Sequence, residues 1–446
     1  MPIQETVWAI LNQWFHPQTR FIVAYSGGKD SHVLLHAVSQ LKQNNNAILI
    51  EAWHVNHGLS PNALAWTEHC RITCEDLNIA FKSFSVSIDT ASKNSLEELA
   101  RNARYAEFQK NLGDNDVLLT AHTQNDQAET VLMHLSRGSG LLGLGGIPEK
   151  TVWPKGQMLR PMLDIDRQAI SEYAQRHKLN WIEDESNQDT RFLRNAVRHN
   201  VLPQLKNLNS GVINNIARSA KLCAETNDLL TEYLLPELQN MLTTDNKIQL
   251  SVLMGESKLS SIKIKSLLRL WFKQNDCSLP SEKKLEEICN QMLWAKHDAC
   301  PEVHWGQHTI KRYQGLLSIH PYTTKKNEMK PNTKFWSLNE SLALSEGTLW
   351  TATEVLGQGM TIAVPKLEVR FRCPGARYRI WGENLSRKLK HILQELNVPP
   401  WERDITPLFF LEGCLVAVGE HIVGKQLKNI DPMVLGWVLR KEKSAN

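Results

Sequence analysis

The stretch that decides the fold runs from Ile22 to Leu35 and reads IVAYSGGKDSHVLL. Its β-branched apolar start, its Ser-Gly-Gly turn and the apolar residues that follow at helical spacing predict a strand, a tight turn and a helix N-terminus. Glycines allow a sharp turn, and the first N–H groups of a helix lack partners and attract anions. The turn from Ser26 to Ser31 therefore predicts a phosphate-binding site.

This turn differs from two other glycine-rich phosphate loops. It has neither the Gly-x4-Gly-Lys-Ser/Thr order of the Walker loop nor the Gly-x-Gly-x2-Gly order of dinucleotide-binding folds. The alternative interpretation is a plain glycine-rich turn in which Asp30 only caps the helix.

Length and composition set the broad class. The chain has 446 residues, so we expect two or three domains rather than one core. Its 42% apolar and 22% charged residues are typical of a soluble protein. Because the formal net charge is only +4, a nucleic-acid-binding surface has to be a local basic patch.

Cysteine usage and apolar runs indicate the compartment. The eight cysteines form no Cys-x2-Cys pair, and no apolar run reaches the roughly 18 residues that a membrane span needs. The first residues include Glu5 and lack an apolar segment long enough for export. We therefore expect a cytoplasmic protein with reduced cysteines and no membrane partner.

Apolar runs alternate with helical patterns along the first part of the chain. Runs at 47–55, 80–86 and 117–121 are interpreted as further strands, with helices between them. This alternation predicts an α/β fold built on a doubly wound parallel sheet, whose ligands lie beyond the carboxyl ends of the strands. The turn at Ser26 and the pair Asn56-His57 fall at such ends.

A polar cluster follows the strand at 117–121. His122, Asp126 and Glu129 are spaced i, i+4 and i+7 on a predicted helix. Such a set can hold Mg²⁺ through carboxylate oxygens or handle protons near neutral pH. A helix cap with a solvated polar face is the alternative, but a third strand end in a chain with a phosphate loop favours an active site.

Two further stretches carry arginines. Ser95 and Glu98 match a capping box, and Arg101 of the same predicted helix can pair with Glu97 at i+4. Farther along, three arginines recur at three and four residues: Arg191, Arg194 and Arg198. On one helix they would form a stripe suited to phosphates. Solvated helix faces are the alternative in both stretches.

These motifs occur in the order seen in the tRNA(Ile)-lysidine synthetase family of ATP pyrophosphatases, which the chain resembles. The matching segments are residues 26–31, 56–59, 122–130, 137–140 and 184–198. The first turn identifies only the superfamily, whereas the later stretches are more specific. Asn125 stands where the family pattern has Asp, and Asp126 and Glu129 match it.

The resemblance implies a ligase that uses ATP and Mg²⁺. ATP would adenylate the carbon-2 oxygen of the wobble cytidine in the CAU anticodon of tRNA(Ile), and the side-chain amine of L-lysine would then displace AMP to give lysidine. ATP would be bound by Ser26, Gly27, Gly28, Lys29, Asp30 and Ser31. Catalytic residues would be Asp30, His122, Asp126, Glu129, Arg101 and Arg194, with Asp30 and Asp126 as Mg²⁺ ligands. The residues decide neither which carboxylate takes the lysine ammonium nor whether the protein is a homodimer.

The resemblance also reaches the end of the chain. We expect a catalytic domain at 1–207, a helix-rich domain at 208–320, a linker at 321–335 and a small α+β domain at 336–446. Eight basic residues stand against two acidic ones between Lys366 and His391, which makes a local cationic patch. The tRNA-binding residues are expected to be Arg191, Arg198, Arg377, Arg379, Lys388 and Lys390.

The residues leave three rival functions open. A tRNA thiolase would need a reactive cysteine pair, and Cys70 and Cys74 come nearest to that requirement. A metabolic amidating ligase would usually bring a glutaminase module, and none is visible. A non-catalytic RNA-binding protein would need the basic patch but no phosphate loop beside His122.

Overall fold

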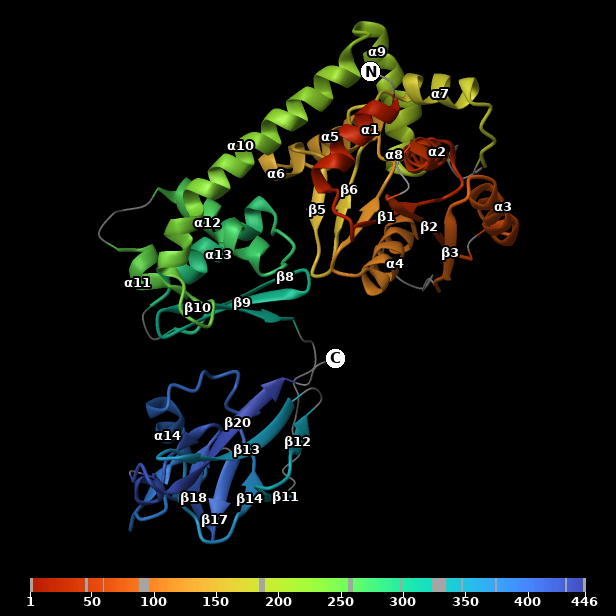
Figure 1. Ribbon diagram of the computed structural model, residues 1–446. Coiled ribbons are helices and arrows are strands. Elements are labelled where there is room, and N and C mark those ends of the chain that lie inside the picture. Colours follow the sequence, from red (N-terminus) through yellow and green to blue (C-terminus); the bar gives the residue numbers. More distant parts are fainter. Residues whose placement is uncertain are drawn as a thin grey trace. The chain divides into compact units, whose positions relative to one another are not determined.

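The computed structural model of the chain describes residues 3–44, 47–58, 60–87, 96–183, 189–255, 260–296, 299–322, 334–345, 348–373, 375–429 and 431–443. The chain divides into two compact units, Met1–Tyr233 and Leu234–Asn446, each of which has its own core (Figure 1). Across these described residues, no helix combines the length and apolarity that crossing a membrane requires.

A six-stranded sheet forms the centre of the first unit, in the order β3-β2-β1-β4-β6-β5. Its strands are β1 (Arg20–Ala24), β2 (Leu49–Asn56), β3 (Ala80–Ser85), β4 (Asp116–Leu119), β5 (Lys150–Val152) and β6 (Gln157–Leu159). All neighbours pair in parallel except the edge pair of β5 and β6. Because the winding reverses between β1 and β4, the predicted doubly wound parallel sheet is confirmed.

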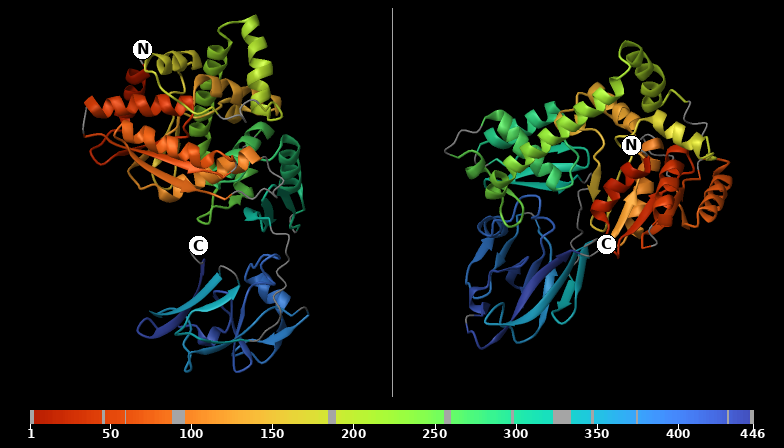
Figure 2. Two further views of the ribbon diagram at one scale, coloured as in Figure 1. Left: turned by 90° about the vertical axis from the view of Figure 1, so that its right-hand side faces the viewer. Right: turned by 45° about the horizontal axis from the view of Figure 1, so that its top comes forward.

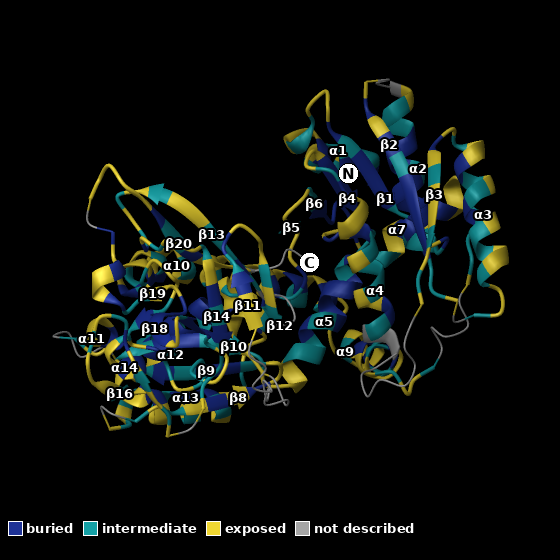
Figure 3. Ribbon diagram, turned by 90° about the horizontal axis from the view of Figure 1, so that it is seen from below, coloured by how far each residue is buried: buried dark blue, intermediate teal, exposed yellow. Residues whose placement is uncertain are grey.

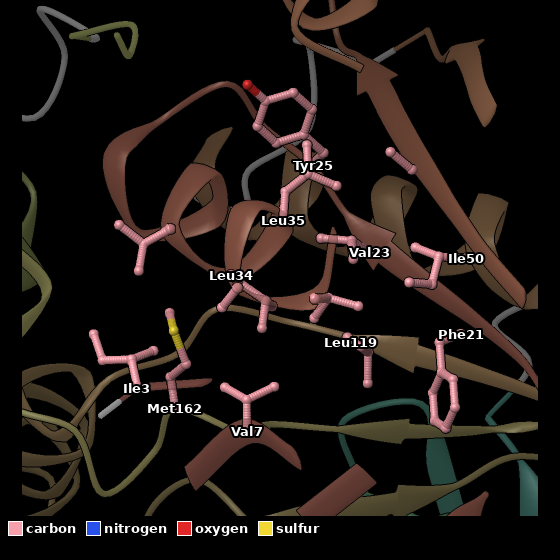
Figure 4. Close-up of a cluster of buried hydrophobic side chains, with 14 of the residues drawn as sticks. Ile3, Val7, Phe21, Val23, Tyr25, Leu34, Leu35, Ile50, Leu119 and Met162 are labelled. Carbon is pink, nitrogen blue, oxygen red and sulfur yellow. The ribbon is translucent and has the colours of Figure 1, made fainter. Parts of the chain in front are cut away.

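Helices lie on both faces of this sheet (Figures 1 and 2). The helices of this unit are α1 (Ile3–Leu11), η1 (Asn12–Trp14), α2 (Lys29–Asn44), α3 (Ala63–Asp76), α4 (Leu96–Asn111), α5 (Gln124–Ser136), α6 (Leu141–Leu144), α7 (Arg167–Arg176), α8 (Leu193–Ala196), the π-helical turn η3 (Val197–Val201) and α9 (Leu202–Leu208). Of these, η3 and α9 pack with α5 in a separate cluster. Phe21 and Val23 of β1 pack with α1, α2 and α7 (Figure 4), whereas Ile22 packs with α4 on the other face. Figure 3 shows β1 in the colour of buried residues.

The chain then enters a helical region through the 30-residue helix α10 (Val212–Met241). The other helices are α11 (Leu250–Leu253), α12 (Ser261–Gln274) and α13 (Glu282–Trp294). They pack with an antiparallel sheet of β7 (Ile248–Gln249), β10 (Leu316–Pro321), β9 (His308–Tyr313) and β8 (Glu302–Trp305). The expected helices are therefore present, together with a sheet that the sequence interpretation omits.

The end of the chain is mainly β-structure. Its elements are β11 (Lys334–Ser337), β12 (Leu342–Ser345), β13 (Thr348–Leu356), β14 (Lys366–Arg370), β15 (Arg377–Arg379), β16 (Ser386–Lys388), α14 (Leu389–Glu395), β17 (Leu408–Leu411), β18 (Cys414–Val418), β19 (His421–Ile422), η4 (Lys425–Leu427) and β20 (Leu435–Lys443). They form a five-stranded, a three-stranded and a two-stranded sheet. The small α+β region expected here is confirmed.

Candidate active site at the carboxyl edge of the parallel sheet

Gly27 gives the phosphate-type turn its shape. Its φ is +83°, and a Cβ atom there would lie 2.7 Å from Cδ1 of Ile182 and 3.0 Å from Sγ of Cys70. The Gly27 carbonyl also accepts a 2.9 Å hydrogen bond from the backbone N–H of Ile182. A side chain at this position would be both strained and crowded, so the turn requires glycine.

Two serines fold the turn back onto the start of α2. The Ser31 hydroxyl donates to the Gly28 carbonyl at 2.9 Å, and its Oγ lies 3.0 Å from Oγ of Ser26. The Ser26 backbone N–H in turn lies 3.3 Å from Oγ of Ser31. Helix α2 begins at Lys29 and runs for 16 residues, so a helix N-terminus follows the turn as expected for an anion site.

Lys29 and Asp30 reach toward α7. Nζ of Lys29 donates to Oγ of Ser171 at 2.7 Å, and Oδ2 of Asp30 lies 3.8 Å from Nη2 of Arg167. Within the part of the chain that the structure describes, Oδ1 of Asp30 is buried and has no hydrogen-bond partner. Burial raises the pKa of this carboxyl group, and the charge of Arg167 opposes the shift. A buried and unsatisfied carboxylate oxygen fits a divalent cation.

His57 and Arg104 connect the end of β2 to α4. Nε and Nη2 of Arg104 lie 3.3 Å and 3.2 Å from Nε2 of His57. Burial, and then the charge of Arg104, lower the pKa of His57 to about 4, so the ring is neutral at physiological pH. The guanidinium of Arg101, one turn earlier on α4, lies 5.1 Å from the ring centroid of Tyr105. The expected pairing of Arg101 with Glu97 lies outside the described side chains, as does the 95–98 capping box.

His122 follows β4 and is also neutral. Its Nδ1 lies 2.9 Å from Oγ1 of Thr120. Burial lowers the pKa of His122 to about 3, although the nearby charge of Asp126 opposes the shift. Such a low pKa does not suit proton transfer near neutral pH. The structure therefore favours a role for His122 as a neutral hydrogen-bonding group.

Asp126 and Glu129 do not lie on a solvated helix face. Thr123 caps α5 and forms a capping box with Asp126, whose Oδ2 accepts from the Thr123 backbone N–H at 2.8 Å. Glu129 is 0% exposed. Nη2 of Arg194 donates to Oδ1 of Asp126 at 2.7 Å, and its Nε donates to Oε2 of Glu129 at 2.8 Å.

Arg198 completes this network from the π-helical turn η3. Its Nε donates to Oε1 of Glu129 at 2.7 Å, and its Nη2 donates to Oε2 at 2.9 Å. Burial lowers the pKa of Arg198, but the hydrogen bonds to Glu129 and the charges of Glu129 and Asp126 together outweigh it, and the net shift is upward. For Asp126, burial raises the pKa, but the charge of Arg194, the neighbouring His122 and the hydrogen bonds from Thr123 together outweigh it and hold the pKa below its usual range. We call Asp126, Glu129, Arg194 and Arg198 the carboxylate–arginine network.

The prediction that Arg191, Arg194 and Arg198 form one stripe is wrong for Arg191. Arg191 precedes α8, and its extended neighbour Phe192 is the residue before that helix begins. Arg191 pairs with Asp189 at 2.6 Å and its side chain is 89% exposed, whereas Arg194 and Arg198 turn inward. The three arginines therefore do not share one face, because the helix that would align them starts after the first of them.

Three further arginines near these strand ends were not predicted from the sequence: Arg104, Arg160 and Arg167. Arg160 is 4% exposed, and its Nη1 donates to the carbonyl of Pro148 at 2.6 Å. A second acceptor of the same nitrogen is Oγ1 of Thr151 at 3.0 Å. Arg104 could have been predicted, because it lies three residues after Arg101 on the same helix and therefore on the same side of it. Arg160 follows a short strand without a periodic pattern, and Arg167 starts the amphipathic helix α7, whose pattern does not mark its first residue as functional.

Basic residues also border a pocket in the C-terminal region. The pocket has a volume of about 420 Å³ and is lined by Arg377, Leu385, Ser386, Arg387, Lys388 and His391. Two of the expected RNA contacts, Arg377 and Lys388, thus line it, together with Arg387. Arg379 instead places Nε and Nη2 3.2 Å from Sγ of Cys414. We call these lining residues the C-terminal basic pocket.

The turn and sheet place the chain in the class of proteins that contain a PP-loop domain, whose family model matches residues 2–205. Two further models match later segments. The TilS substrate binding domain matches residues 257–318, and the TilS substrate C-terminal domain matches residues 367–438.

The chain belongs to the tRNA(Ile)-lysidine synthase family. The tRNA(Ile)-lysidine synthase of Coxiella burnetii is 39% identical over 404 residues, which cover 90% of this chain and 88% of that protein. The protein of the same name from Photorhabdus laumondii is 35% identical over 431 residues and covers 95% of both chains. The resemblance seen in the motifs is therefore confirmed across nearly the whole length.

Proposed function

We propose that this protein is a cytoplasmic ligase that joins L-lysine to carbon 2 of the wobble cytidine in the CAU anticodon of tRNA(Ile). In the first step the carbon-2 oxygen attacks the α-phosphorus of ATP and pyrophosphate leaves. In the second step the uncharged side-chain amine of lysine attacks carbon 2, AMP departs with the oxygen, and the amine loses its remaining excess proton. The observation that carries this proposal is the Gly27-shaped turn at the N-terminus of α2, beside the unsatisfied Asp30 carboxylate.

The ATP phosphates suit the backbone N–H groups between Ser26 and Ser31. The serine hydrogen bonds already fix the shape of the turn, but the N–H groups of Ser26 and Gly28 donate to serine hydroxyls within it, so an anion would compete with these two bonds. When bound, Mg²⁺ would offset the negative charge that builds up on departing pyrophosphate. Among the expected metal ligands, Asp30 fits better than Asp126, since both oxygens of Asp126 already accept hydrogen bonds.

The arginines suit the anionic groups of the other substrates. Arg101 and Arg104 project from the same helix, and Arg104 contacts a neutral His57, so its positive charge is not cancelled by this neighbour. Guanidinium groups bind carboxylates and phosphates through paired hydrogen bonds. Arg101 and Arg194 remain our candidates for the lysine carboxylate or an RNA phosphate.

The C-terminal basic pocket supports contact with tRNA away from the reacting base. Arg377, Arg387 and Lys388 line one concave site, and of these Arg387 already forms an ion pair with Glu395. Phosphate contacts of this kind position an RNA without reading its bases. We therefore assign this region to tRNA binding, together with the exposed Arg191.

The rival thiolase function is disfavoured by the state of its cysteines. Cys70 and Cys74 are fully buried on α3, and burial raises the pKa of each thiol to about 12. A nucleophilic or metal-binding cysteine needs a thiolate, which a raised pKa opposes. Among the described residues, no group of three His, Cys, Asp or Glu side chains is placed to hold a metal ion.

The test is a product analysis with labelled ATP. We expect AMP and pyrophosphate to form only when tRNA(Ile) with a CAU anticodon is present, and lysine to enter the RNA mole for mole with AMP. Without lysine, adenylated tRNA should accumulate. A tRNA(Ile) with a GAU anticodon is the control, because it lacks the wobble cytidine. Formation of ADP and phosphate, or AMP formation with no lysine in the RNA, would contradict the proposal.

A further inference from the structure

Glu129 is placed to hold two arginines and has no room for a substrate. Its side chain is 1% exposed, and its carboxylate receives three hydrogen bonds, two from Arg198 and one from Arg194. These bonds occupy both oxygens. A metal ion or a lysine ammonium could reach Glu129 only by displacing a guanidinium from a buried and charge-balanced contact, which is costly.

The arginines are more accessible than the carboxylate that binds them. The side chains of Arg194 and Arg198 are 20% and 18% exposed, against 1% for Glu129. Arg194 also bridges to Asp126, so one guanidinium ties together the two carboxylates of α5. Glu129 therefore contacts the inner edges of both guanidinium groups, while part of each remains open to solvent.

The backbone that carries the arginines is itself unusual. The α-helical turn at Leu193–Ala196 passes directly into the π-helical turn η3, which begins at Val197 and contains Arg198. Such turns are rare in α-helical segments and are often found at functional sites. The two bonds from Arg198 to Glu129 link this turn to α5, and Val197 packs with Ala128 of α5 in the same region.

We propose that Glu129 is a positioning residue that acts through Arg194 and Arg198, rather than a ligand for metal or lysine. The role rests on the proposed function for its activity readout, but the geometry predicts a second effect that needs no substrate. Removing the charge of Glu129 frees both guanidinium groups and loosens residues 193–201. Activity falls because the arginines lose their fixed position, as when a partner that orients a ligand is lost.

The first measurement is amide hydrogen exchange across residues 193–201 in the full-length protein without substrates. Glu129→Gln should raise exchange in this segment and leave α2 unchanged. Glu282→Gln is the matched control, because Glu282 also binds two cations, Lys265 and Arg269, but its side chain is 56% exposed. That control should leave exchange at 193–201 unchanged. If Glu129→Gln does not fold, Glu129→Asp, which keeps the charge but shortens its reach, replaces it.

The second measurement is steady-state kinetics. Glu129→Gln should lower kcat roughly 10–100-fold with little change in KM for ATP. The double variant Glu129→Gln with Arg198→Met should be little worse than either single variant, because both remove the same contact. Unchanged exchange at 193–201, additive losses in the double variant, or recovery of Glu129→Gln activity at higher Mg²⁺ would each overturn the positioning role. A wild-type protein without ligase activity would refute the proposed function but leave the exchange test valid.

Discussion

The backbone N–H of Ile182 donates to the carbonyl of Gly27, so a segment more than 150 residues away in sequence braces the phosphate-type turn. The brace explains why the second residue of the Ser-Gly-Gly motif has no space for a side chain: a Cβ would meet Ile182 at 2.7 Å. Two independent constraints, the positive φ and the crowding, act at the same glycine.

Gly27→Ala should therefore destabilise the fold as well as abolish ATP chemistry. We expect a loss of about 1–3 kcal/mol in the free energy of unfolding, the usual cost of a strained backbone position. Gly28→Ala is the matched control for stability, because a Cβ there would meet Ser26 Oγ at an ordinary 3.5 Å and its φ is not in the left-handed region. Denaturant unfolding of both variants measures this difference in the free energy of unfolding. Equal stabilities would contradict the bracing by Ile182.

Asp30→Asn should separate activity from stability. Burial raises the pKa of Asp30, so its charged form is disfavoured by the folded protein at neutral pH. Removing that charge should leave the melting temperature unchanged or higher, while pyrophosphate release falls at least about 100-fold because a positioned charge is lost. Asp116→Asn is the control variant. Asp116 accepts hydrogen bonds from Arg20 and from the Gly113 N–H, so neutralising it should lower the melting temperature. Full pyrophosphate release by Asp30→Asn would refute the role of this carboxylate.

The sequence predicted the parallel sheet and the turn because both depend on local patterns. An apolar β-branched run, two glycines and a helical apolar pattern all fall within about 14 residues of each other, and each constrains the backbone where it stands. The alternation of such runs then leaves few topologies other than the doubly wound sheet.

The carboxylate–arginine network could not be predicted in the same way. Glu129 is separated by 65 and 69 residues from Arg194 and Arg198, and the spacing of the arginines is the same for a solvated stripe as for a buried one. Only burial distinguishes a solvated stripe from a buried one. Burial depends on tertiary packing, which the spacing of residues in the sequence does not reveal. The hairpin at Gln314-Gly315 could have been predicted from the sequence, because the glycine is a turn signal. Both residues have positive φ and join β9 to β10.

Acid should weaken the first unit partly through His32. This side chain is 5% exposed, and burial lowers its pKa from 6.5 to about 4, an effect that the neighbouring His69 and His36 reinforce and a backbone contact at Asn180 opposes. Between pH 6.5 and 4 the unfolded chain therefore binds up to one proton more at this residue than the folded chain does. Its contribution to stability is complete above pH 6.5 and declines as the pH falls toward 4.

We expect His32→Gln to flatten the dependence of the free energy of unfolding on pH in that window, whatever its effect on stability at neutral pH. Denaturant titrations at half-unit pH steps measure this slope. His16→Gln, at an exposed position, is the matched control and should keep the wild-type slope. A His32→Gln slope equal to the wild-type slope would contradict the lowered pKa, because it would mean that His32 binds its proton equally well in the folded and unfolded chains.

The C-terminal basic pocket should account for a measurable part of tRNA affinity. Each phosphate contact that is lost reduces the slope of log affinity against log salt by about 0.7–0.9. Replacing Arg377 and Lys388, which line the pocket, by Gln should therefore weaken tRNA binding, flatten its salt dependence and raise KM for tRNA. KM for ATP and lysine should remain near the wild-type values, because the ATP turn belongs to the first unit.

The paired variant Arg379→Gln with Lys390→Gln tests whether the pocket or the general charge of the region matters. It removes the same number of positive charges from residues that do not line the pocket. Filter binding between low and physiological salt compares the two double variants with the wild type. If the pocket holds an RNA phosphate, the Arg377 and Lys388 pair should lose more affinity and more salt slope than the other pair. Equal losses would mean that the charge acts diffusely, and unchanged binding in both would remove this region from the tRNA-binding surface.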